Sequence, residues 1–204
     1  MVLLRSFLFT LLLFISAEVF SQKINVQVYM LHPKAKPGSD TIYHDMVRPL
    51  IWSDFQGKPA HGHSAGAVVS SGIAFNSSSN YDGRTLELKV YVYTYFSKKN
   101  SWKKADVNSA YHLLHEQRHF DITRIGAEKL VDEIRKASFT IANYNTKLNQ
   151  IFNKVYTENN IMQNQYDRET RHSINVEKQH EWNDKIAIAL SAINNNVTVK
   201  NKEE

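Results

Sequence analysis

The chain has 204 residues, a formal net charge of +5 and 42% hydrophobic residues, which fits one mid-sized domain with a substantial core. It contains no cysteine, and this excludes a disulfide scaffold, a thiolate metal site and a cysteine nucleophile. The basic residues are scattered and form no stripe interleaved with aromatic residues, so the charge does not favour nucleic-acid binding.

Residues 1–21 have the features of a secretory signal peptide. A basic residue near the start precedes an apolar run from Phe7 to Ile15, and the segment ends on a small residue. The run is shorter than the ~20 residues that a membrane span needs, and no later stretch is long and apolar enough. We therefore expect an exported protein, periplasmic or extracellular, in which residues 22–195 form one domain and residues 196–204 a disordered polar tail.

The first half of the chain predicts strands, and the second half predicts helices. Alternating apolar residues indicate strands over residues 23–31, 67–75 and 85–96, with a turn near 80–83 between the last two. Helical spacing of apolar residues then indicates three helices. The first begins after a cap at Asp106, Asn108 or Ser109 and ends near Lys136, the second ends near Tyr166, and the third covers about 174–193.

This order of elements predicts an α+β fold. We expect a small, mostly antiparallel sheet, followed by a long helical hairpin and a third helix.

A His-Glu-x-x-His motif lies on the first predicted helix. The four-residue spacing places His115 and His119 on one helix face, where both imidazoles can bind one zinc ion. Glu116 is next to the first histidine and is the candidate general base. A solvated face that happens to carry two histidines and a glutamate is the alternative, but the apolar residues around the motif indicate a buried helix. A second pair, His61 and His63, is a weaker metal candidate because it lies in a glycine-rich loop.

A catalytic zinc takes three protein ligands, so a third must come from elsewhere in the chain. If the first two helices form an antiparallel hairpin, the returning chain reaches the level of the motif at about residues 159–163. His172 lies just beyond that level, after the predicted helix end, and is our first choice. Asp167 and Glu169 are the alternatives.

Tyr166 and two aspartates near this level have open roles. Tyr166 is a candidate catalytic residue that could polarise a substrate carbonyl or steady an oxyanion, although an aromatic residue in the core of the hairpin fits the same pattern. If His172 is the ligand, Asp167 or Asp121 could instead orient one of the imidazoles through a hydrogen bond.

Four motifs, taken in their order and spacing, resemble a known family. They are Leu50-x-Trp52-x-Asp54-Phe55-x-Gly57, Ser101-Trp102, the stretch from Leu113 to Asp121, and Tyr166-Asp167-x-Glu169-Thr170-x-His172. The family is a bacterial domain-of-unknown-function family whose members are described as secreted zinc-dependent proteases. The resemblance extends over about residues 45–190.

This resemblance implies secretion from a Gram-negative bacterium and a zincin-like peptidase fold, with His115 and His119 as zinc ligands and Glu116 as the catalytic base. Ser173 departs from the family pattern, which has glycine after the motif histidine.

The sequence thus predicts a secreted zinc metallopeptidase acting on a peptide or protein substrate. Two other hypotheses share the metal motif. One is a binding module, not an enzyme, whose zinc is structural, and the other is a zinc amide hydrolase acting on a cell-wall substrate.

Overall fold

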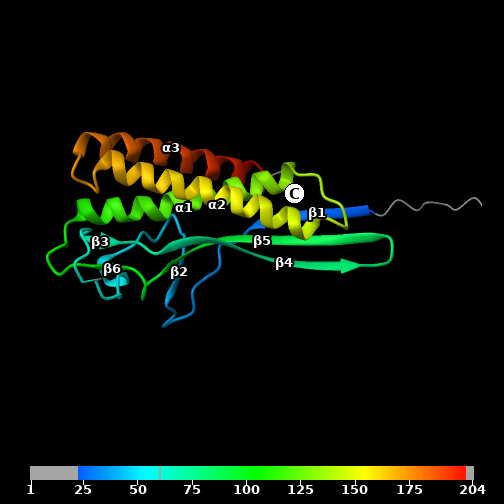
Figure 1. Ribbon diagram of the computed structural model, residues 1–204, viewed down its shortest axis with the longest axis horizontal. Coiled ribbons are helices and arrows are strands. Elements are labelled where there is room, and N and C mark those ends of the chain that lie inside the picture. Colours follow the sequence, from blue (N-terminus) through cyan, green and yellow to red (C-terminus); the bar gives the residue numbers. More distant parts are fainter. Residues whose placement is uncertain (1–22, 60, 201–204) are drawn as a thin grey trace, which may run out of the picture.

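The computed structural model describes residues 23–59 and 61–200 (Figure 1). The predicted signal peptide lies outside these residues, as does the end of the predicted tail. Among the described residues, no helix combines the length and the apolar character needed to cross a membrane.

The sheet is built around its longest strand, β5 (Thr85–Ser97). One edge of β5 pairs with the antiparallel strand β4 (Ser71–Tyr81), and the other edge pairs first with the parallel strand β1 (Lys23–Met30) and then with the short antiparallel strand β2 (Thr41–Tyr43). The predicted α+β fold is confirmed, with a mixed sheet because β1 runs parallel to β5.

The strand predicted over residues 67–75 divides into two elements. Ala67–Val68 forms β3, which pairs with β6 (Trp102–Lys103) in a separate two-stranded sheet, and β4 begins only at Ser71. β4 then continues through a polar stretch to Tyr81. That extension has no apolar alternation because its residues are exposed, and its backbone pairing with β5 makes it a strand.

Three long helices follow: α1 (Ala110–Lys136), α2 (Tyr144–Thr170) and α3 (Val176–Lys200). Ser109 caps α1 by accepting a hydrogen bond from the backbone N–H of His112 at 3.1 Å. α2 continues past its predicted end at Tyr166. α3 continues past its predicted end at residue 193, so residues 196–200, placed in the disordered tail by composition, continue the helix.

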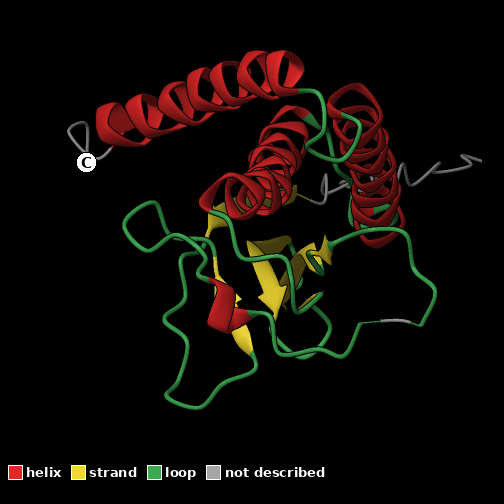
Figure 2. Ribbon diagram, turned by 90° about the vertical axis from the view of Figure 1, so that its left-hand side faces the viewer, coloured by secondary structure: helices red, strands yellow, loops and turns green. Residues whose placement is uncertain are grey.

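All three helices lie on one side of the sheet (Figures 1 and 2). α1 is the central helix, because its two faces are buried against different partners. One face packs against the sheet and α2 in a core that includes Leu88, Val90, Leu130 and Val131. The opposite side of the hairpin packs against α3 in a second core, formed by Ile122, Tyr166, Trp182, Ile186 and Leu190. α1, which carries the motif, is therefore packed against the sheet, α2 and α3.

The loop before β3 is anchored to α1. Phe55 packs against Phe96 and Phe120, and Asp54 accepts hydrogen bonds from the Arg48 guanidinium and from the backbone N–H of Ile51. These contacts explain the first of the four motifs as a structural element that closes one end of the core.

Candidate metal centre

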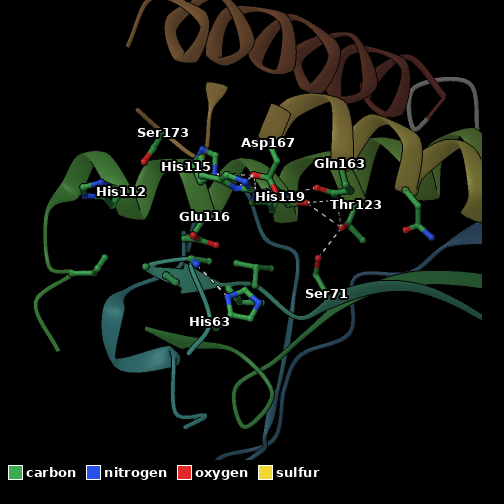
Figure 3. Close-up of a pocket in the computed structure, with 18 of the residues that line it drawn as sticks. His63, Ser71, His112, His115, Glu116, His119, Thr123, Gln163, Asp167 and Ser173 are labelled. Carbon is green, nitrogen blue, oxygen red and sulfur yellow. Dashed lines mark hydrogen bonds and ion pairs between the residues drawn. The ribbon is translucent and has the colours of Figure 1, made fainter. Parts of the chain in front are cut away.

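The two motif histidines converge on one carboxylate. His115 and His119 lie one turn apart on α1, and their Nε2 atoms are 3.2 Å and 3.0 Å from the same atom, Oδ1 of Asp167 (Figure 3). One potential ligand atom from each of the three residues lies within 4.8 Å of the other two. Two imidazoles and one carboxylate form a donor set that suits zinc.

The α1–α2 hairpin brings Asp167 to this position. Gln163 contacts His119 at the level predicted from the helical rise, and Asp167 follows one turn later on the same face of α2. Of the two carboxylates considered as alternative ligands, Glu169 faces elsewhere, since its oxygens accept hydrogen bonds from the Gln165 amide and the Trp182 indole. Asp167 is thus the carboxylate that meets the histidines.

His172, the first choice for the third ligand, lies at the edge of the cluster. Its Nδ1 is 3.3 Å from Oδ1 of Asp167, but 67% of its side chain is exposed. The structure therefore brings His172 close to the other three residues without burying it among them.

His172 belongs to a left-handed turn between α2 and α3. Arg171, His172 and Ser173 have φ angles of +51°, +52° and +69°, and they are the non-glycine residues with positive φ in the described part of the chain. Each such residue costs roughly 1–2 kcal/mol relative to a right-handed conformation. The Tyr111 hydroxyl holds the turn by donating to the carbonyl of Ser173 at 2.8 Å. Ser173, the position that departs from the family pattern, is thus in a conformation that favours glycine.

The second nitrogen of each motif imidazole contacts a glutamine. His115 Nδ1 is 2.8 Å from Oε1 of Gln179 on α3, and His119 Nδ1 is 2.6 Å from Oε1 of Gln163 on α2. Sequence reasoning missed both glutamines. No motif marks either of them, and Gln179 lies 64 residues from its histidine.

Glu116 is buried beside the histidines, facing the chain between β3 and β4 (Figure 3). Burial raises the pKa of its carboxyl group, and the nearby His119 and His115 oppose this increase. A carboxyl group with a raised pKa accepts a proton more readily, as a general base must.

The hydrogen-bond partners of Asp167 strongly favour the ionised form of its carboxyl group. Burial alone would raise the pKa of this carboxyl group, but the hydrogen bonds with His115 and His119 outweigh burial and hold the pKa well below its usual range. Burial likewise would lower the pKa of His119, yet its contact with Asp167 raises the pKa above the ordinary histidine value. The site is therefore built to keep an anion beside positive charge.

Tyr166 lies under the histidines and faces away from the cavity. Its ring stacks on His115 with centroids 4.7 Å apart, and its buried hydroxyl donates to the carbonyl of His115 and accepts from Gln179. Burial raises the pKa of this hydroxyl. These contacts support the core position considered for Tyr166 and place its hydroxyl away from the cavity where a catalytic group would act.

The remaining candidates do not join the cluster. Asp121 binds His44, Gln117 and Arg118, so it orients neither motif imidazole. His63 packs on Trp102 at the edge of the cavity, and His61 is exposed. Among the described residues, His115, His119 and Asp167 form the group of side chains that could hold a metal ion.

A cavity of about 670 Å³ opens onto the cluster. α1 supplies His115, Glu116 and His119, α2 supplies the face from Tyr156 to Asp167, and the opposite wall comes from residues 63–69 and 71–73. The part of the cavity between α2 and β4 is lined by uncharged side chains, including the polar groups of Ser71, Thr123 and Asn160.

Residues 96–173 match a family described as "Bacterial protein of unknown function (DUF922)". The matched segment contains the His-Glu-x-x-His helix, Asp167 and His172, and it includes three of the four motifs on which the resemblance was based. It is shorter than the range of 45–190, and its description names no activity. Comparisons with curated proteins and with solved structures find no match.

Proposed function

We propose that this protein is an exported zinc-dependent peptidase with a zincin-like active site. The observation that carries the proposal is the convergence of His115 Nε2 and His119 Nε2 on Asp167, with the buried carboxyl group of Glu116 beside them. In this proposal His115, His119 and Asp167 hold the zinc ion. Bound zinc supplies Lewis-acid chemistry, because it polarises a carbonyl group and acidifies a water molecule.

Glu116 and Asp167 have different roles in the proposed reaction. Glu116 takes the proton of the attacking water and delivers it to the leaving amine, a role favoured by its position on the cavity wall and its raised pKa. Asp167 keeps its negative charge and neutralises part of the charge of the ion.

The shape of the cavity favours an extended peptide. Its α2 wall runs from Tyr156 to Asp167, a span of ~16 Å at the helical rise per residue. An extended chain of about five residues has that length. The uncharged polar groups along the wall suit peptide amides, and the exposed side chains of Tyr156 and Ile174 offer apolar contacts at the rim.

One observation favours a second function, that of a non-enzymatic binding module with a structural zinc. His172 Nδ1 lies 3.3 Å from Asp167 Oδ1, so a small shift of the left-handed turn would supply a fourth protein ligand and close the site. A hydrolase of cell-wall amides would use the same chemistry as the peptidase and would differ only in the substrate that the cavity accepts.

The decisive experiment compares the wild type with Glu116→Gln and Glu169→Gln. The second variant is the control, because Glu169 lies outside the cavity, bonded to Gln165 and Trp182. We expect each protein to bind one zinc ion, as measured by competition with a chromophoric chelator. Cleavage of an unfolded protein should fall by about 100-fold or more in Glu116→Gln, the size of a typical general-base contribution, and remain unchanged in Glu169→Gln.

Equal cleavage by the wild type and Glu116→Gln would remove Glu116 from the mechanism. Stoichiometric zinc without cleavage of unfolded protein or cell-wall peptide would support the binding module instead.

A further inference from the structure

We infer that two glutamines, Gln179 and Gln163, are positioning residues that fix both motif imidazoles with a proton on Nδ1, so that each Nε2 offers its lone pair to the metal position. The inference rests on the proposed metal centre, which it deepens by assigning α3 a part in it. It follows from hydrogen-bonding roles that are set by the chemistry of the groups or by their neighbours.

The orientation of the Gln179 amide is set from two directions. The Tyr166 hydroxyl donates to the carbonyl of His115 at 3.2 Å, so toward Gln179 it can only accept. Asn183 Oδ1 receives a hydrogen bond from Arg118 Nε at 3.1 Å, and an arginine nitrogen is always a donor. The group of Gln179 that meets both oxygens, at 2.7 Å and 3.0 Å, must therefore be its NH2 group.

The other end of the same amide determines the state of His115. With the NH2 group committed, the carbonyl oxygen of Gln179 faces His115 Nδ1 at 2.8 Å. An amide oxygen only accepts, so Nδ1 must carry the proton. Gln179 is completely buried, which leaves no water to replace this acceptor.

Gln163 acts on His119 in the same way. Its nitrogen lies 2.9 Å from the backbone carbonyl of His119, an obligatory acceptor, and 3.2 Å from Thr123 Oγ1. Its oxygen therefore faces His119 Nδ1, at 2.6 Å, and accepts the proton. Two glutamines from two different helices thus impose the same tautomer on both histidines.

This arrangement of the two imidazoles favours the binding of a cation. With Nδ1 protonated, the Nε2 atom of each imidazole faces the carboxylate oxygen of Asp167, and this arrangement is stable only with a proton or a metal ion between nitrogen and oxygen. Orienting groups of this kind typically change metal affinity by about 10–100-fold. Because Gln179 belongs to α3, the centre extends beyond the matched residues 96–173.

The test uses protein labelled with 15N at its histidines, with imidazole spectra recorded before and after the addition of zinc. We expect a protonated Nδ1 on His115 and His119 in both states, and a shift of both Nε2 signals when zinc binds. Gln179→Leu should remove the Nδ1–H signature of His115 alone and weaken zinc binding about 10–100-fold. Gln165→Leu is the control, because this glutamine contacts Glu169 and neither histidine.

The outcomes separate this inference from the proposed function. An unprotonated Nδ1 on either histidine of the wild type would overturn the inference, as would unchanged zinc affinity in Gln179→Leu. Wild-type protein that shows both Nδ1–H signals but binds no zinc would instead refute the proposed metal centre and leave the tautomers as inferred. If Gln179→Leu does not fold, Gln163→Leu makes the same test at His119 from a less buried position.

Discussion

Replacing Ser173 with glycine should stabilise the protein. Ser173 has a φ angle of +69° and ends a run of three left-handed residues. A left-handed conformation costs a non-glycine residue roughly 1–2 kcal/mol, and glycine is free of this cost. Glycine in turn loses about 0.5–1 kcal/mol more conformational entropy on folding. The difference predicts a gain of about 0.5–1 kcal/mol in the free energy of unfolding.

Little else should change at this position. The backbone carbonyl of Ser173, which accepts from Tyr111, is retained in the variant, and no hydrogen bond of the Ser173 hydroxyl is found among the described residues. For a chain of this size the gain corresponds to a rise of about 1–4 °C in Tm.

Urea unfolding in the presence of a chelator measures this gain without any contribution from bound metal. Ser138→Gly is the matched control, since Ser138 lies in a loop and is not among the residues with positive φ. It should lose about 0.4–1 kcal/mol, as glycine does at an ordinary position. If Ser173→Gly loses stability like this control, the left-handed turn does not store the strain that we assign to it.

Three other predictions concern packing and metal binding. Gly126→Ala should lower the free energy of unfolding, measured in urea, by on the order of 1 kcal/mol. The added methyl would lie 2.5 Å from the amide nitrogen of Asn159, and this overpacking outweighs the better helix propensity of alanine. Unchanged stability would contradict the close packing of α1 and α2. Zinc at 100 times its Kd should raise the free energy of unfolding by about 2.7 kcal/mol, and a chelator should reverse this; no change would argue against a preformed site. Asp167→Asn should weaken zinc binding by at least about 10-fold in chelator competition, whereas Glu169→Gln should not; equal affinities would exclude Asp167 as a ligand.

Much of the site could be predicted from local spacing. The four-residue separation of His115 and His119 places both rings on one helix face wherever that helix packs, and Glu116 follows beside them. The level of the returning helix was also predictable, because a helical hairpin converts sequence distance into height at a constant rise. Helix periodicity does not specify how a side chain near that level turns, so His172, Asp167 and Glu169 remained alternatives.

The sequence by itself determined the order of strands and helices, the α+β class and the motif helix, because these depend on local periodicity and spacing. Tertiary structure alone decided which carboxylate meets the histidines, since Glu169 is drawn to Trp182 while Asp167 faces the cavity. It also decided that Gln179 on a distant helix would contact His115. Such contacts depend on how α3 packs across the hairpin, and hydrogen-bond partners brought together by packing leave no periodic signal in a chain.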